Sequence, residues 1–124
     1  MKVISTTNAP AAIGPYSQAL RTGNMMFVSG QIPVDPATGK MADTIEEQAK
    51  QSLTNMKSIL EAEGLTLANV IKTTVFLADL NDFAKVNEVY ASFFEAPYPA
   101  RSCVQVAAIP KGAGVEIECI AVVD

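Results

Sequence analysis

The chain has 124 residues, 49% of them hydrophobic and 18% charged, which is typical of one folded domain rather than of a disordered segment. Its net charge of −4 and its scattered Lys and Arg residues disfavour a nucleic-acid partner, because binding phosphates normally requires a basic patch. The absence of histidine excludes a serine–histidine triad, and two isolated cysteines, Cys103 and Cys119, argue against a zinc site.

The N-terminus lacks the apolar stretch and cleavage pattern of a secretory signal, and no apolar run reaches the length of a membrane span. We therefore expect a cytosolic protein with a single domain over residues 1–124 and with both cysteines as thiols. Because neither histidine nor a carboxylate cluster is present, we also expect neither a metal ion nor an organic cofactor.

The first quarter of the chain is predicted to contain two strands. Residues 18–21, followed by a Thr-Gly-Asn stretch, indicate a strand and a hairpin turn. The apolar run 25–28 lies between two glycines and indicates a buried strand. Residues 33–39 are rich in Pro, Asp and Gly and predict a surface loop.

Two helices are expected in the middle of the chain. Residues 44–47 fit a capping box, after which hydrophobic residues recur every three or four positions up to Leu60, and Gly64 suits the C-terminal stop. A second helix begins after a cap at Asn81 or Asp82. Its apolar face consists of Phe83, Val86, Tyr90 and Phe93.

Three more strands are expected, at residues 70–77, 102–109 and 115–123, the last two joined by a Pro- and Gly-rich turn. Two helices can cover only one face of a sheet with five or six strands. The other face also carries apolar residues, among them Ile120 and Val122. We therefore expect an α+β domain that associates with copies of itself.

Arg101 is the most informative candidate for a binding residue. It stands at the start of a strand, directly after a Pro-rich loop, where its planar guanidinium can bind a carboxylate or phosphate bidentately. The alternative is an ordinary surface ion pair. Cys103 faces the same side of a regular strand, but with no histidine to accept its proton it is better interpreted as structural than as a nucleophile.

Glu118 is the candidate for handling water. It shares a strand face with Glu116, Ile120 and Val122, and apolar neighbours raise the pKa of a carboxyl group by desolvation. The alternative for Glu118 is an exposed polar position, and we interpret Glu116 in that way. The pattern does not decide whether Glu118 and Arg101 share a face, because a symmetric hairpin separates them and a bulge in the turn reverses the result.

Four other residues are weaker candidates. Tyr16 and the pair Ser29-Gly30 stand where a hydroxyl or a backbone N–H can reach a ligand, although turn chemistry explains them equally well. Asn87 lies beside the apolar stripe of the second predicted helix, where an amide is unexpected.

Five segments, in the same order along the chain, resemble the reactive-intermediate deaminase family in its RidA/YjgF-like branch. These segments are Ile13–Ala19, Phe27–Pro33, Val86–Tyr90, Pro99–Val104 and Val115–Ala121. The resemblance implies a chorismate-mutase-like α+β fold: a mixed sheet with two helices packed on one face, assembled as a homotrimer with ligand clefts between subunits. It also implies hydrolysis of 2-imino acids, such as 2-iminobutanoate and 2-iminopropanoate, to 2-keto acids and ammonia. Such imines are released by pyridoxal-phosphate-dependent dehydratases.

The same resemblance assigns roles to residues. Arg101 would bind the substrate carboxylate with support from the backbone N–H of Cys103, and Glu118 would position the attacking water. The remaining cleft residues would be Tyr16, Ser29, Gly30, Asn87 and Phe83. Three other functions remain open: a non-catalytic 2-keto acid binder or sensor, an endoribonuclease or translation inhibitor, and a chaperone-like surface. The acidic pI and the absence of histidine argue against the nuclease.

Overall fold

In the computed structural model, which describes residues 1–124, a six-stranded mixed sheet runs in the order β1-β2-β3-β6-β4-β5. The strands are β1 (Lys2–Ile4), β2 (Ala19–Thr22), β3 (Met25–Gln31), β4 (Val70–Leu77), β5 (Ala100–Gln105) and β6 (Val115–Val122). Only β4 and β5 pair in parallel, and every other pair is antiparallel. The predicted α+β class and the mixed sheet are therefore confirmed.

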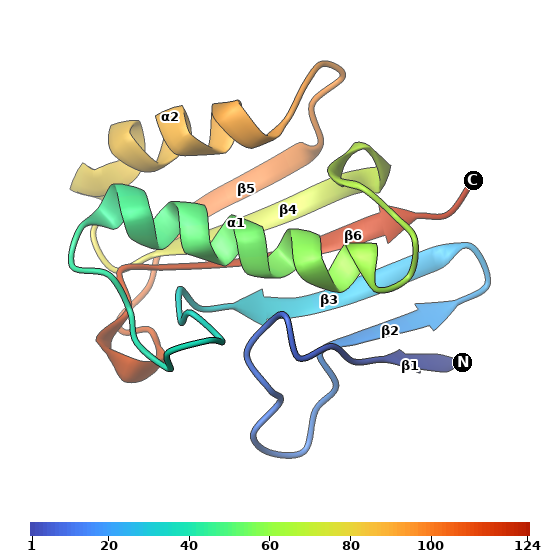
Figure 1. The fold of residues 1–124 in the computed structure, drawn as a ribbon. Coiled ribbons are helices and arrows are strands. Elements are labelled where there is room, and N and C mark those ends of the chain that lie inside the picture. The colour runs from blue at the N-terminus through green and yellow to red at the C-terminus, as the bar shows by residue number, and fades with distance from the viewer.

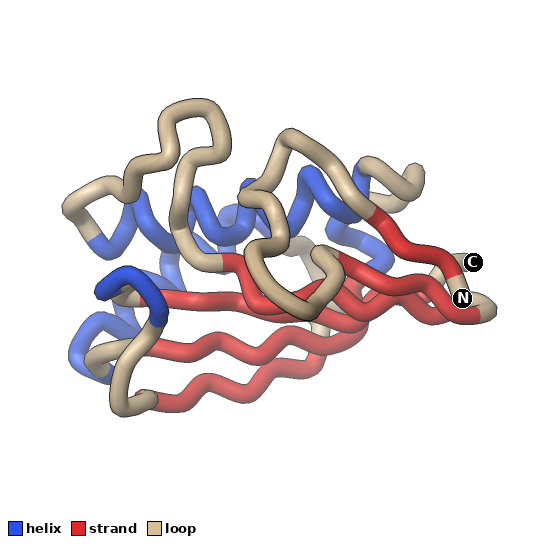
Figure 2. Tube along the Cα trace, turned by 90° about the horizontal axis from the view of Figure 1, so that it is seen from below, coloured by secondary structure: helices blue, strands red, loops and turns tan.

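Helices α1 (Ile45–Glu61) and α2 (Phe83–Phe93) lie on the same face of the sheet (Figures 1 and 2). The Thr44 hydroxyl accepts a hydrogen bond from the backbone N–H of Glu47 at 3.3 Å, which is one half of the predicted capping box. Asp82 occupies the N-cap position of α2 but makes no side-chain capping bond. No helix is long and apolar enough to cross a membrane.

The hydrophobic core fills the space between this face and the two helices. Helix α1 contributes Leu53, Met56 and Leu60, all fully buried. Strand β6 contributes every second residue, as the alternation predicted. These residues are Val115, Ile117, Cys119 and Ala121.

The predicted hairpin between the last two strands is wrong. Strand β4 lies between β5 and β6, so that Arg101 is paired with Thr73 and Glu118 with Thr74, on either side of β4. Local sequence patterns indicate where a strand forms but not which strand it pairs with. The strand expected at 102–109 also begins and ends earlier, because β5 pairs only with β4 and leaves it after Gln105.

No helix covers the second face of the sheet, which we call the open face. Register pairing places Phe27, Ile120 and Lys72 side by side on it, and Phe76 beside Val104. Phe27 and Val104 are each 43% exposed. This face therefore carries apolar side chains that the chain itself leaves partly in contact with solvent.

Candidate functional site

Arg101 lies on the helix-covered face, at the edge of the sheet, and is half-buried. Its Cζ atom lies 4.8 Å from the ring centroid of Tyr90 and 5.5 Å from that of Phe83. Its Nη1 donates a hydrogen bond to Oδ1 of Asn87 at 2.8 Å. Both ion pairs of the structure involve Glu63, so Arg101 has no carboxylate partner within the chain. The interpretation of Arg101 as part of a surface ion pair is therefore wrong.

One face of α2 supplies all three neighbours of the guanidinium. Phe83, Asn87 and Tyr90 are four and three residues apart, and this spacing places them on the same side of a helix. The amide of Asn87, unexpected beside an apolar stripe, is thus explained by its hydrogen bond to Arg101. Sequence reasoning missed the contact of Tyr90, although the helical spacing from Asn87 was the available signal.

Cys103 shares the helix-covered face with Arg101, as predicted, because it is paired with the buried residue Val75. Burial raises the pKa of the Cys103 thiol, and the nearby positive charge of Arg101 only partly opposes this. Burial also raises the pKa of Cys119 to about 12. Both thiols are therefore protonated at neutral pH, which supports a structural role for their side chains.

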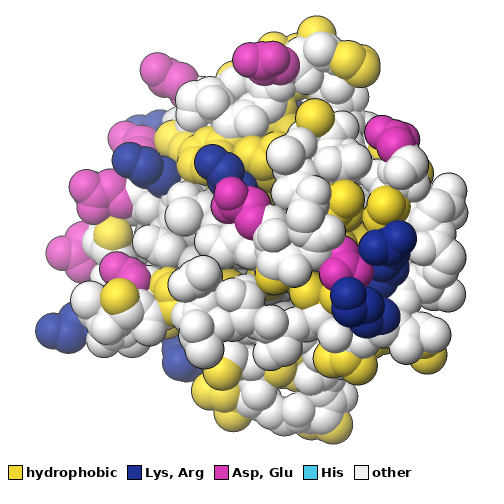
Figure 3. All heavy atoms as spheres, turned by 45° about the vertical axis from the view of Figure 1, so that its right-hand side comes forward, with side chains coloured by type: hydrophobic (Ala, Val, Ile, Leu, Met, Phe, Trp, Pro, Cys, Tyr) yellow, Lys and Arg dark blue, Asp and Glu magenta, His cyan; other side chains and the backbone are white.

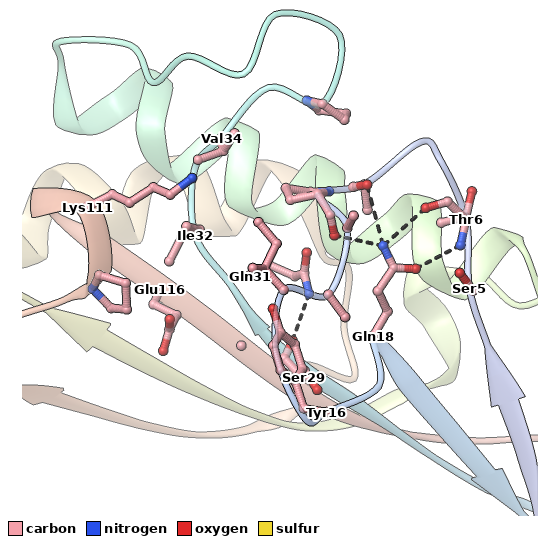
Figure 4. Close-up of a pocket in the computed structure, with 18 of the residues that line it drawn as sticks. Ser5, Thr6, Tyr16, Gln18, Ser29, Gln31, Ile32, Val34, Lys111 and Glu116 are labelled. Carbon is pink, nitrogen blue, oxygen red and sulfur yellow. Dashed lines mark hydrogen bonds between the residues drawn. The ribbon is translucent and has the colours of Figure 1, made fainter.

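A second set of predicted site residues lies around a groove on the open face. Tyr16, Ser29, Gly30 and Glu118 all line this groove, which has a volume of about 1330 Å³. Figure 4 shows Tyr16 and Ser29 on one side of it and Glu116 on the other. The Ser29 hydroxyl donates a hydrogen bond of 2.6 Å to the backbone carbonyl of Ser17, next to Tyr16. The same groove is bordered by Lys111 and by Glu116, neither of which was predicted to belong to the site.

Of the two glutamates on this strand face, Glu116 is the more buried. It is half-buried and its pKa is raised, mainly by burial and further by the nearby charge of Glu118. A Cβ atom at Gly30 would lie 2.9 Å from Cδ of Glu116, so the glycine leaves room for this carboxylate. The interpretation of Glu116 as an exposed position is wrong, and Glu118 is the exposed member of the pair.

The partial burial of Glu116 could not be predicted from the sequence, because the surroundings of this side chain depend on β3, which is distant in the chain. The β3–β6 pairing shifts register between Val28 and Gln31, and this irregularity brings Gly30 against Glu116. The alternation within β6 places the two glutamates on one face but carries no information about their neighbours.

The predicted site residues thus form two groups on opposite faces of the sheet. Arg101 is paired with Thr73 and Glu118 with Thr74, which are consecutive residues of β4 and point to opposite faces. Arg101, Cys103, Asn87 and Phe83 form the first group, on the helix-covered face. Tyr16, Ser29, Gly30 and Glu118 form the second, on the open face, where Glu116 joins them.

The structure shows neither a basic surface patch on the face drawn in Figure 3 nor a cluster of metal ligands. Acidic and basic side chains alternate over the face seen in Figure 3, and they form no continuous basic patch there. No group of three or more Cys, Asp or Glu residues is arranged to hold a metal ion.

The structure is that of a small α+β protein in which Arg101, with no carboxylate partner in the chain, forms a candidate site for an anionic ligand. The family model described as Endoribonuclease L-PSP matches residues 6–123. A 2-iminobutanoate/2-iminopropanoate deaminase of Salmonella typhimurium is 57% identical over 124 residues, which cover 98% of this chain and 97% of that protein. The RutC family protein PM1466 of Pasteurella multocida is 59% identical over 125 residues, with coverage of 98% and 97%.

A crystal structure of Escherichia coli TdcF with bound serine has a TM-score of 0.97 to this chain and 54% sequence identity, and the alignment covers 100% of both chains. These similarities extend over the whole domain rather than over isolated motifs. The chain therefore belongs to the RidA/YjgF family, whose members include proteins named 2-iminobutanoate/2-iminopropanoate deaminase.

Proposed function

We propose that this protein hydrolyses 2-imino acids such as 2-iminobutanoate and 2-iminopropanoate to 2-keto acids and ammonia. The observation that carries the proposal is the environment of Arg101. The guanidinium is held by two aromatic rings and an amide, and no carboxylate of the chain neutralises it. A positive charge held in this way is suited to a carboxylate from outside the chain. The relatives named as deaminases supply the substrate class.

We further propose that the working site forms between two copies of the chain. A 2-imino acid spans only a few bonds, so residues on opposite faces of one sheet cannot contact it together. Arg101 lies at the outer edge of β5, and the carboxylates lie in the groove on the open face. A homotrimer in which the β5 edge of one copy meets the groove of the next would unite the two groups, and it would cover the apolar open face.

In this assembly the two groups take different roles. The helix-face group would bind the substrate: Arg101 and the backbone N–H of Cys103 hold its carboxylate, Asn87 holds the guanidinium, and Phe83, 40% exposed, provides an apolar wall. The open-face group, with Tyr16, Ser29 and Gly30 around the ligand, would supply the water. Glu118 is the sequence-based candidate for orienting this water, whereas its desolvation makes Glu116 the stronger candidate for accepting the proton.

The chemistry needs no group beyond these. A carboxylate accepts a proton from water while the oxygen attacks C2 of the protonated imine, and this forms a carbon–oxygen bond and converts the C=N bond into a C–N single bond. The protonated carboxyl group then gives this proton to the nitrogen of the tetrahedral adduct. As the C–N bond breaks and ammonia leaves, the hydroxyl oxygen forms the C=O bond and its proton passes to the carboxylate. Aligning the substrate and water in the site reduces the entropic part of the barrier, and the negative carboxylate stabilises the cationic imine.

A non-catalytic 2-keto acid binder is the second candidate, because the cradle around Arg101 would bind a keto acid as well as an imino acid. The family model's name suggests an endoribonuclease, but the net charge of −4 provides little attraction for RNA. The deciding experiment adds the protein to a threonine dehydratase reaction and follows the disappearance of the imine. Faster disappearance supports the enzyme, whereas an unchanged imine lifetime together with tight 2-oxobutanoate binding supports the binder.

A further inference from the structure

The aromatic ring beneath Arg101 is held in place at both ends. Tyr90 is only 5% exposed, and its ring contacts both the guanidinium, 4.8 Å away, and the ring of Phe94, with centroids 4.6 Å apart. Its hydroxyl reaches across to the sheet and shares a hydrogen bond of 2.7 Å with the hydroxyl of Thr73. Thr73 is fully buried and is the register partner of Arg101 itself.

Thr73, Tyr90 and Arg101 therefore form a closed chain of contacts between sheet and helix. The backbone of β5 places Arg101 beside Thr73, the Thr73 hydroxyl fixes the phenol, and the ring supports the guanidinium. The Arg101 side chain makes just one hydrogen bond within the protein, to Asn87. A long side chain with a single hydrogen bond needs a second constraint to remain in one orientation, and a flat ring beneath the guanidinium supplies it.

The ring also preserves the charge that a carboxylate would bind. A neutral ring attracts the guanidinium through its π electrons without neutralising it. Burial raises the pKa of Tyr90, which keeps the phenol neutral. An acidic residue in this place would hold Arg101 equally well but would compete with the substrate.

We propose that Tyr90, anchored by Thr73, is a positioning residue that orients the Arg101 guanidinium for carboxylate recognition. Its role in the reaction rests on the proposed function, but the orientation of Arg101 does not. Tyr90 acts through Arg101, and its loss weakens the recognition of a carboxylate group specifically rather than the fold of the cleft as a whole.

The test compares two ligands, 2-oxobutanoate and its neutral amide 2-oxobutanamide, by calorimetry on the intact assembly. Tyr90→Leu removes the ring and is expected to weaken binding of the carboxylate roughly tenfold while leaving the amide within about twofold. Tyr90→Phe and Thr73→Val each remove one side of the hydroxyl pair and are expected to cause a smaller loss. Because both break the same bond, the double variant should lose little more than either single variant.

A matched control separates positioning from general destabilisation. Ile59→Val removes a methylene from the core on α1, a helix that supplies none of the neighbours of the guanidinium described above, and should lower the thermal midpoint without changing the ratio of carboxylate to amide affinity. The proposal is overturned if Tyr90→Leu changes this ratio no more than Ile59→Val does, with both variants folded.

A second readout applies if the wild-type protein binds neither ligand, which would count against the proposed function. Nitrogen-15 relaxation of the Arg101 Nε–H group reports the order of the guanidinium directly. Lower order in Tyr90→Leu and Thr73→Val than in Ile59→Val would support the positioning role, and equal order would refute it.

Discussion

At the scale of single residues, the central feature is an arginine that its own chain leaves without a counter-ion. We predict that Arg101→Lys is severely impaired, because lysine keeps the charge but loses the planar fork. Arg101→Ala should be worse, by roughly 2–5 kcal/mol in apparent transition-state stabilisation, since the substrate carboxylate would be left unpaired. The measurement is the rate of 2-iminobutanoate hydrolysis, with mass by light scattering as the control for assembly. An Arg101→Ala variant that assembles normally and retains near wild-type rate would show that the site is misplaced.

We predict that replacing Glu116 and replacing Glu118 will affect the pH profile of kcat/KM differently. A carboxylate that accepts a proton must be ionised, so kcat/KM falls as the pH drops through its pKa. Because the pKa of Glu116 is raised above the ordinary value of 4.5, the acid limb of the profile should lie above that value. Glu116→Gln should abolish most activity. Glu118→Gln should retain activity and shift the limb to lower pH, because it removes the neighbouring negative charge.

If Glu118→Gln is the inactive variant and Glu116→Gln keeps its rate and pH profile, then Glu118, and not Glu116, accepts the proton from water. Circular dichroism of both variants controls for folding, since each change replaces a carboxylate by an isosteric amide.

The grouping of residues around Arg101 could be predicted from the sequence, because it depends on local helical spacing. The environment of Glu116 could not, because it depends on contacts between distant strands. Phe83, Asn87 and Tyr90 lie within one helix, so their common face follows from helical spacing. The burial of Glu116 depends on Gly30, which is 86 positions away in the chain and reaches it only through the irregular register of β3 and β6. Local periodicity carries no information about such pairings.

At the scale of elements, the strands and helices themselves were largely predictable, and the order of the strands was not. Residues 70–77 form β4 as expected because β-branched residues dominate that run. The insertion of β4 between β5 and β6, however, is a property of the whole sheet. That order also places Arg101 and the two glutamates on opposite faces, which is why the proposed site needs two copies of the chain.

A buried amide fixes the loop that borders the open-face groove. Gln18 is 4% exposed; its Nε2 donates to the carbonyls of Thr6, Ala9 and Pro10, and its Oε1 accepts from the backbone N–H of Thr6 (Figure 4). We predict that Gln18→Leu lowers the free energy of unfolding by roughly 2 kcal/mol or more, because several backbone groups lose their partner. Hydrogen exchange should show the loss of protection first at residues 6–10.

The control for this change is an exposed glutamine with a single bond. Gln105 accepts one hydrogen bond, from the backbone N–H of Leu80, so Gln105→Leu should alter stability by only a few tenths of a kcal/mol. Equal destabilisation by the two variants, measured by urea denaturation, would mean that Gln18 does not hold the loop.

At the scale of the whole molecule, the open face is the candidate surface for self-association. It carries apolar side chains such as Phe27, Ile120 and Val104, and both helices are on the other side. We predict a homotrimer with three times the monomer mass of 13.1 kDa, stable at micromolar concentration. Light scattering measures this directly, and replacing Phe27 by Glu should shift the mass towards that of the monomer. A wild-type protein that scatters as a monomer would remove the shared site.

The central claim is that Arg101 of one copy and Glu116 of the next act on the same substrate, and mixing two inactive variants tests it most directly. Arg101→Ala and Glu116→Gln chains are refolded together in equal amounts, and imine hydrolysis is measured on the mixed trimers. In a closed ring, a site is intact when the Glu116→Gln copy supplies the arginine and the Arg101→Ala copy supplies the glutamate. Random mixing should therefore restore roughly one quarter of the wild-type activity per chain. Mixed trimers that form but remain as inactive as either parent would contradict the account.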